Sequence, residues 1–197
     1  MNSSTHTDMY QELEALQRQL GDLRNRMTAD AASADPLAIA SADELPQGEV
    51  QLLQCRLSEE MIGFPLSVVK EVAPMAALTP MPESPPWVHG MLNLRGDPVP
   101  VLDVSARLER RTRVSKLSDL IVICHCDGQR VGMLVPDVVG VQTFAADVAR
   151  STIDGLARAP YLLGVLNFEG AQIFVLSVAR LLKLSDLPEA HESETND

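Results

Sequence analysis

The sequence has few aromatic residues, few cysteines and no excess of positive charge. Aromatic side chains make up 4% of the 197 residues, so the hydrophobic content of 46% must come mainly from aliphatic side chains. Three cysteines are too few, and odd in number, for a disulfide framework, which favours a reducing environment. The formal net charge of −11 leaves no surplus of basic surface to neutralise phosphates, which argues against nucleic acid as a partner.

Long apolar runs are also missing. No stretch approaches the roughly 18 apolar residues that a membrane-spanning helix needs, so we expect no direct insertion into a membrane. The first residues, Met1–His6, show neither the basic nor the apolar segment of a signal peptide. Together with the cysteine count, these absences predict a cytoplasmic protein.

Motifs of common enzyme chemistry are missing as well. The sequence contains no G-x-S-x-G turn, no P-loop and no G-x-G-x-x-G motif. Cys124-His125-Cys126 suggests a metal site, but in a strand both sulfurs lie on one face with His125 opposite, and zinc usually needs four ligands. We therefore predict no catalytic residue, no metal and no cofactor.

The acidic charge is concentrated at the two ends of the chain. Residues 1–48 carry eight acidic and three basic residues, and residues 186–197 carry five acidic and no basic ones. Residues 29–48 are rich in Ala, Ser, Asp and Pro, which is typical of a linker. We predict an N-terminal extension over 1–48, a folded domain over 49–185 and an acidic tail over 186–197.

An apolar stripe runs through residues 8–28 of the N-terminal extension. Leucines and methionines recur there at alternating spacings of four and three, the a/d pattern of an amphipathic helix: Met9, Leu13, Leu16, Leu20, Leu23 and Met27. The stripe indicates either a helix for docking or self-association, or a marginal helix on a flexible tail. The second interpretation stays open because isolated helices of this length are barely stable in water.

An internal repeat organises the folded domain. Short β-rich runs, separated by Gly, Pro and charged residues as in small all-β barrels, form two similar series. Residues 86–96 align without gaps on 160–170, an offset of 74, and the strands upstream align at an offset of 69. The repeat predicts two similar barrels over about 50–110 and 118–184.

The combination of motifs over residues 82–108 resembles the signature of CheW-like domains. It contains a proline-rich approach, a glycine, an Asn-Leu-Arg-Gly turn, Pro-Val-x-Asp and a short helix. Val69-Lys70-Glu71-Val72 is similar to the family's Val-x-Glu-Ile/Val, and the resemblance covers about 50–184. It implies an all-β fold of two five-stranded SH3-like barrels from an internal duplication, with short helices and, here, an N-terminal helical extension.

The resemblance also implies a function. CheW-like proteins are non-enzymatic scaffolds that couple the cytoplasmic tip of a methyl-accepting chemoreceptor to a CheA-type histidine kinase. We therefore expect recruitment to receptor arrays at the inner face of the membrane. An adaptor of a pilus or surface-sensing pathway is the alternative, and an enzyme on an SH3-like scaffold is the interpretation from another class.

Five partner-binding candidates follow from the resemblance: Arg95, Glu71, Val69, Gly96 and Gly90. A hairpin-tip arginine can make bidentate contacts to a partner carboxylate. The repeat places Glu169 at the position equivalent to Arg95, so folding does not require arginine there, which favours partner binding over a solvated turn residue. Val69 and Glu71, two residues apart, are expected on one strand face, where they would suit a receptor groove. The alternative is ordinary packing for Val69 and a solvated position for Glu71.

A basic segment connects the two halves. Its members are Arg107, Arg110, Arg111, Arg113 and Lys116. We predict a solvated connector, with an electrostatic contact to an acidic partner, or to the acidic ends of the chain, as the alternative.

Overall fold

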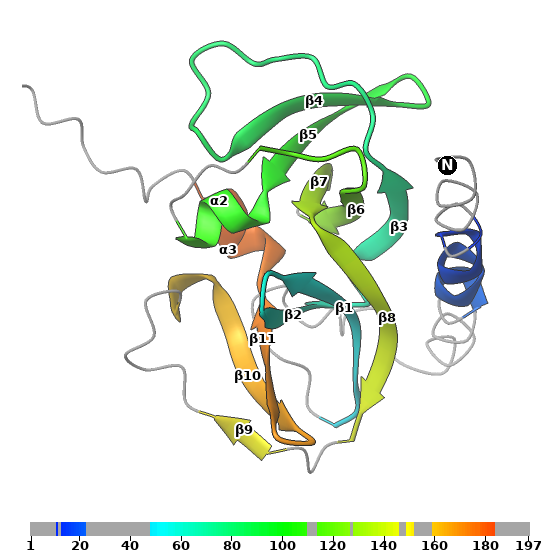
Figure 1. Cartoon of the computed structure of the whole chain (residues 1–197), viewed down its shortest axis with the longest axis vertical. Coiled ribbons are helices and arrows are strands. Elements are labelled where there is room, and N and C mark those ends of the chain that lie inside the picture. Colours follow the sequence, from blue (N-terminus) through cyan, green and yellow to red (C-terminus); the bar gives the residue numbers. More distant parts are fainter. Residues whose placement is uncertain are drawn as a thin grey trace, which may run out of the picture.

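The computed structural model describes residues 11, 13–22, 48–109, 114–126, 128–145, 149–151 and 159–183. Strands dominate this part of the chain and form two sheets (Figure 1). The predicted linker, apart from Gly48, and the predicted acidic tail lie outside the described residues.

The first sheet, which we call barrel A, has the strand order β8-β1-β2-β11-β10-β9. Its strands are β1 (Val50–Leu57), β2 (Glu60–Pro65), β8 (Asp137–Phe144), β9 (Ala149–Ser151), β10 (Leu162–Phe168) and β11 (Ala171–Leu176). Neighbouring strands are antiparallel except β11 and β2, which are parallel.

The second sheet, barrel B, has the strand order β3-β6-β7-β5-β4. Its strands are β3 (Val69–Pro74), β4 (Val88–Leu94), β5 (Asp97–Asp103), β6 (Leu120–Cys126) and β7 (Gln129–Val135). The pair β5 and β7 is parallel. Thr79 and Met91 exchange two backbone hydrogen bonds of 2.9 and 2.8 Å, so the chain that leaves β3 also lines the edge of β4.

Short helices complete the domain: α2 (Val104–Glu109), the 3-10 turn η1 (Ala159–Tyr161) and α3 (Val178–Leu182). The helices α2 and α3 follow β5 and β11, the last strands of the two halves. The predicted all-β class with two small barrels and short helices is confirmed; β9 adds a short sixth strand to barrel A.

Each barrel takes strands from both halves of the sequence. Barrel B joins β3, β4 and β5 from the first half to β6 and β7 from the second, and barrel A joins β1 and β2 to the remaining strands of the second half. The predicted division into contiguous barrels over 50–110 and 118–184 was therefore wrong. A repeat identifies equivalent strands, but it cannot show with which copy a strand pairs.

The exchange is reciprocal, as strand register shows. In barrel B the parallel pair joins Val101 to Gly132, and in barrel A it joins Val175 to Gly63. The two pairs are related by the offsets of 74 and 69 found in the sequence. The predicted repeat is thus expressed as two barrels with the same strand order.

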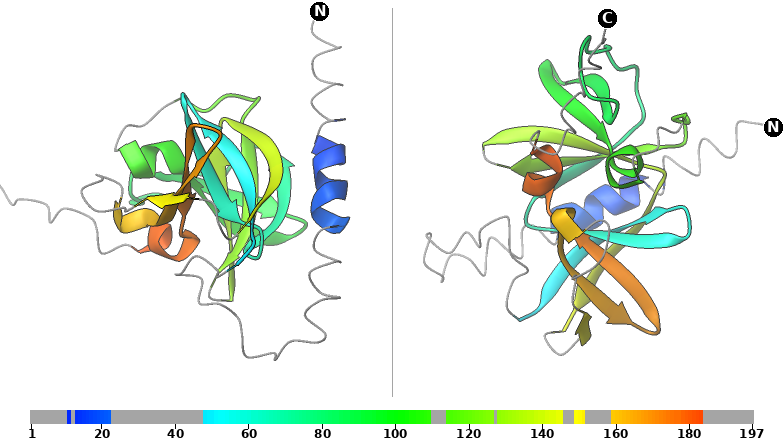
Figure 2. Two further views of the ribbon diagram at one scale, coloured as in Figure 1. Left: turned by 90° about the horizontal axis from the view of Figure 1, so that it is seen from below. Right: turned by 90° about the vertical axis from the view of Figure 1, so that its left-hand side faces the viewer.

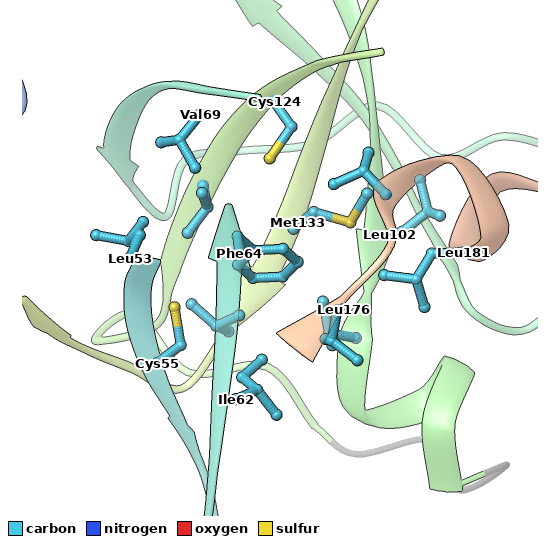
Figure 3. Close-up of a cluster of buried hydrophobic side chains, with 14 of the residues drawn as sticks. Leu53, Cys55, Ile62, Phe64, Val69, Leu102, Cys124, Met133, Leu176 and Leu181 are labelled. Carbon is cyan, nitrogen blue, oxygen red and sulfur yellow. The ribbon is translucent and has the colours of Figure 1, made fainter. Parts of the chain in front are cut away.

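Three hydrophobic clusters form the core. One lies within barrel A and includes Leu52 and Phe144, and another lies within barrel B and includes Ile121 and Leu134. The largest cluster joins strands of both sheets (Figure 3) and is called the inter-barrel core below. Because the side chains of a strand alternate between its two faces, Leu53 faces the inter-barrel core while Leu52 faces the interior of barrel A.

Residues 13–22, called the N-terminal helix below, lie beside β3 and β8 (Figures 1 and 2). Leu13 and Leu20 belong to the inter-barrel core, and Leu16 packs against it. The side-chain amide of Gln17 donates to the carbonyl of Val72, at 2.8 Å. The described part of the stripe therefore packs on the protein's own domain, a contact that the sequence had left open.

Arg107 departs from the predicted solvated connector. Its side chain is in α2 and only 5% exposed, with the guanidinium 4.4 Å from the ring centre of Trp87 and 4.7 Å from that of Tyr161. It donates hydrogen bonds to the carbonyls of Leu181 and Lys183, at 3.1 and 2.7 Å. The prediction was wrong for Arg107 because α2 turns this side chain between the halves. Lys116 is exposed, and the other connector residues lie outside the described part: Arg110, Arg111 and Arg113.

Candidate functional site

The turn between β4 and β5 presents Arg95 at the surface. Arg95 and Gly96 have φ angles of 55° and 96°, the two positive values of a type I′ hairpin turn. The Asn93 side chain accepts a hydrogen bond from the Gly96 amide at 2.8 Å and holds the turn. The equivalent turn of barrel A repeats this conformation with Glu169, at φ 50°. The same backbone therefore carries opposite charges in the two barrels.

Arg95 forms an ion pair with Glu71 on β3. The guanidinium lies 2.9 Å from the carboxylate, and the side chains of Arg95 and Glu71 are 80% and 26% exposed. Ion pairs with such exposure contribute only about 0.2–1 kcal/mol. A carboxylate from another protein could therefore replace Glu71 as the partner of Arg95 at little cost.

A bulge on β3 separates Val69 from Glu71. Pairing with β6 shifts register between these two residues, so Val69 faces the inter-barrel core and is 1% exposed, whereas Glu71 faces a surface pocket. The expectation that they share one face was wrong. It assumed strict alternation, and the bulge inserts an extra residue at Lys70.

Glu71 and Arg95 line a pocket of about 390 Å³, called the basic pocket below. Its lining residues come from β3, the β4–β5 turn, β6 and β7: Lys70, Glu71, Arg95, Ile123, His125 and Arg130. Arg130 pairs with Asp97 at 2.7 Å. Three cationic side chains thus stand against two carboxylates, on a chain whose net charge is −11. This local surplus of positive charge suits a carboxylate-bearing surface.

Four residues that line the basic pocket were not predicted as site residues: Lys70, Ile123, His125 and Arg130. For His125 the sequence did indicate the exposed strand face. The alternation in Cys124-His125-Cys126 predicted two sulfurs on one face and His125 on the other. This is confirmed, because both cysteines are buried free thiols in the inter-barrel core and His125 is exposed. Lys70 and Arg130 had no sequence signal, because folding alone brings β3 and β7 to one pocket.

The remaining predicted site residues lie elsewhere. Gly96 forms the turn that holds Arg95. Gly90 is buried in β4 with φ 143°, and a Cβ atom there would lie 2.7 Å from the carbonyl oxygen of Thr79. Of the five candidates, Arg95 and Glu71 line the basic pocket, while Gly90 and Val69 occupy packed positions.

A histidine–hydroxyl contact lies outside the basic pocket. His89 Nε2 lies 3.0 Å from the hydroxyl of Ser115. Within the described ranges, no three His, Cys, Asp or Glu side chains gather to hold a metal ion. In the same residues, no helix is long and apolar enough to cross a membrane.

Burial makes the core thiols unreactive. Burial, reinforced by the neighbouring Cys126, raises the pKa of Cys124 far above the ordinary thiol value. Burial likewise raises the pKa of Cys55, and the neighbouring Cys124 and Asp137 add to the rise because a second negative charge beside them is unfavourable. Both thiols therefore stay protonated near neutral pH, and a protonated thiol is a poor nucleophile and metal ligand.

Comparison with known proteins identifies the family. Residues 51–186 match the CheW-like domain. The chemotaxis protein CheW of Rhizobium meliloti is 28% identical over 70% of this chain and 90% of its own length, and that of Thermotoga maritima is 33% identical over 72% and 92%. The crystal structure of the scaffolding protein TtCheW from Thermoanaerobacter tengcongensis superposes with a TM-score of 0.64 at 23% identity, covering 73% of this chain and 94% of that one. The fold, the repeat and these matches agree: the chain belongs to the CheW-like domain family.

Proposed function

We propose that the protein is a cytoplasmic scaffold that couples a chemoreceptor tip to a CheA-type histidine kinase. The observation that carries the proposal is the basic pocket of a CheW-like domain, with Arg95 exposed on a hydrogen-bonded hairpin turn and paired at the surface with Glu71. The relatives named chemotaxis protein CheW and the structural neighbour named a scaffolding protein support the same role.

The proposed mechanism is geometric. A carboxylate on the receptor takes the place of Glu71 beside Arg95, and the other cations of the basic pocket add a favourable field. A separate surface of the same rigid domain binds the kinase, so the receptor and the kinase are held at a fixed distance. Such a scaffold performs no bond chemistry, and a few well-placed side chains set its specificity.

The decisive experiment replaces Arg95 and measures stability and receptor binding together. Arg95→Glu inverts the charge on a side chain that is 80% exposed, at a turn where the other barrel carries Glu169. The free energy of unfolding should change by less than about 1 kcal/mol, because surface substitutions rarely cost more. Binding to a soluble receptor-tip fragment should weaken at least about tenfold, which corresponds to about 1.4 kcal/mol.

Arg56→Glu is the matched control. Arg56 is 55% exposed on β1 of barrel A, pairs with Asp137 at 3.6 Å, and lies outside the basic pocket. The substitution changes the net charge by the same amount, so it reports the effect of charge alone. If both variants weaken receptor binding equally, or if neither does, the basic pocket is not the receptor site.

Kinase activity tests the scaffold role itself. The purified protein should change the autophosphorylation rate of a CheA-type kinase only when receptor is present. Purification of the tagged protein from its native cell should bring down that kinase, and the receptor that comes with it identifies a flagellar, pilus or surface-sensing pathway. A catalytic activity of the isolated protein that is lost on changing one Asp, Cys or His would overturn the proposal.

A further inference from the structure

The N-terminal helix has one face in the domain and one face in solvent. Leu13 and Leu20 are 7% and 4% exposed, and Leu16 packs beside them on the inter-barrel core. The side chains of Glu14 and Arg18, on the outer face, are 71% and 78% exposed. Spacings of three and four therefore place the leucines in a single contact strip, as in a helix bound to a groove.

The strip lies along the outer edge of β3. Within the described residues β3 pairs as a strand with β6 alone, so its second edge offers backbone groups to partners other than a strand. The Gln17 amide satisfies one of them, the Val72 carbonyl, at 2.8 Å. Figure 1 and the left view of Figure 2 place the helix alongside β3 and β8, the edge strands of barrels B and A. We call this location the seam.

The seam and the basic pocket share β3. Val72, which accepts the hydrogen bond from Gln17, directly follows Glu71, which lines the basic pocket. Val69 and Val72 belong to the same cluster as the leucines of the N-terminal helix, while Lys70 and Glu71 turn into the pocket. A partner that binds across β3 therefore meets the N-terminal helix.

The N-terminal helix is an addition to a complete domain. The family match begins at residue 51, and 73% of this chain accounts for 94% of the solved relative. The described helix is short and contains Gly21, and helices of such length are marginal without packing. Within the described residues it is held by three leucines and one side-chain hydrogen bond, few contacts compared with those that join the strands.

We propose that the N-terminal helix is an internal occupant of a helix-binding seam, and that it must leave before a partner's amphipathic helix can bind there. The partner helix carries apolar residues at the same spacings of three and four. The identity of that partner as a helix of the receptor tip rests on the proposed function, whereas the occupancy of the seam does not. The apparent dissociation constant of the partner is then the intrinsic one divided by the fraction of molecules with an open seam.

A pair of charge-neutral variants of the full chain tests the occupancy. Leu13→Gln/Leu20→Gln introduces two glutamines into the contact strip and so disrupts it. Glu14→Gln/Arg18→Gln introduces two glutamines on the exposed face of the same helix. The probe is a fluorescent peptide with the sequence of residues 8–28. We expect the first variant to bind the peptide at least about tenfold more tightly than the wild type does, with the second variant like the wild type.

Three further measurements accompany the binding assay: amide hydrogen exchange, urea unfolding and the oligomeric state. Amides of the N-terminal helix should exchange faster in the first variant only, and urea unfolding should show that the barrels remain folded. If the double variant unfolds, Leu16→Gln alone replaces it. Equal peptide binding by wild type and variant overturns the proposal. A wild-type dimer that the first variant converts to a monomer also overturns it, because the helix would then occupy a second copy.

The receptor-tip fragment separates this proposal from the proposed function. Tighter binding to the first variant, by at least about tenfold, supports the proposal with the receptor as the partner. Equal binding to all three proteins leaves the scaffold role intact and overturns the competition at the seam. If no protein binds the fragment but the peptide result holds, the proposed function fails while the internal occupancy stands.

Discussion

Asp103 and Ser177 cap equivalent helices in the two halves of the chain. The Asp103 carboxylate accepts the Ala106 amide at 3.0 Å, and the Ser177 hydroxyl accepts the Arg180 amide at 3.2 Å. Each residue thus caps the short helix that follows its strand. The repeat offset of 74 relates the two positions, and the change from Asp to Ser keeps the acceptor three residues before the capped amide.

Exchange between the two caps should therefore be tolerated better than their removal. Asp103→Ala and Ser177→Ala should each lower the free energy of unfolding by about 0.5–2 kcal/mol, and Asp103→Ser should lower it less than Asp103→Ala. Urea unfolding of the three variants provides the measurement. Equal losses for Asp103→Ser and Asp103→Ala would show that capping is not the role of Asp103.

Arg107 should be essential for stability and irreplaceable by lysine. Arg107→Met leaves the carbonyls of Leu181 and Lys183 without this donor and should cost about 2–5 kcal/mol. Arg107→Lys should also destabilise, by about 1–3 kcal/mol, because an ammonium cannot stack between two rings and donate in a planar fork. Arg56→Lys on the exposed face of β1 is the control and should stay within about 0.5 kcal/mol. A wild-type unfolding midpoint for Arg107→Lys would contradict this account.

Two glycines with nearly the same φ angle allow the cost of backbone strain to be separated from the cost of a steric clash. Gly90 and Gly140 have φ angles of +143° and +147°, but a Cβ atom at Gly90 would lie 2.7 Å from the Thr79 carbonyl oxygen, whereas at Gly140 it would meet nothing within 4 Å. Gly140→Ala should cost only backbone strain, about 1–3 kcal/mol. Gly90→Ala should cost about 1–3 kcal/mol more, because the Thr79 backbone must move. Equal unfolding free energies would mean that the contact with Thr79 relaxes freely.

The buried thiols should make the fold sensitive to alkaline pH. Burial raises the pKa of Cys55 and Cys124 in the folded state, whereas unfolded thiols ionise near pH 8.5. Above about pH 8.5 the unfolded state therefore holds fewer protons than the folded state, and the free energy of unfolding falls as pH rises. The free energy of unfolding should fall by up to about 1.4 kcal/mol per pH unit for each thiol. Below about pH 8.5 the stabilisation that comes from keeping the thiols protonated is fully present.

Urea unfolding between pH 7.5 and 9.5 under reducing conditions measures this slope. Cys55→Ala and Cys124→Ala should each be less stable at pH 7.5 but lose less stability as pH rises, because each removes one ionising thiol from the unfolded chain. The double variant should have the shallowest slope. An unchanged slope in the double variant would assign the alkaline transition to other groups.

Most of the fold could be predicted from the sequence, but only two of the six residues that line the basic pocket, Glu71 and Arg95. Alternation identified the strands, and the repeat identified equivalent positions such as Arg95 and Glu169, which share a turn conformation. Local patterns can do this because turns and strand faces depend on neighbouring residues. The stripe over residues 8–28 likewise predicted the contact face of the N-terminal helix, although it left open what that face would contact.

What escaped prediction depends on contacts between distant segments. The bulge at Lys70 reverses the face of Glu71, and nothing in the local sequence marks it. The ion pair of Glu71 with Arg95 and the entry of Arg130 into the basic pocket arise only when β3, β6 and β7 meet. The location of Arg107 follows from two aromatic residues, Trp87 and Tyr161, that lie in different halves.

The exchange of strands has a consequence for the order in which the chain can fold on the ribosome. All five strands of barrel B lie between Val69 and Val135, whereas barrel A is assembled from strands on both sides of that segment. Barrel B is thus nested in barrel A, and it can close while the C-terminal third of the chain is still being synthesised. During that time the hairpin of β1 and β2 cannot pair with β8 or β11. Its apolar face therefore stays unpacked until the chain has been synthesised as far as Leu176, the end of β11. A circular permutant opened between β2 and β3 would remove that delay, because its two barrels would each be contiguous in sequence.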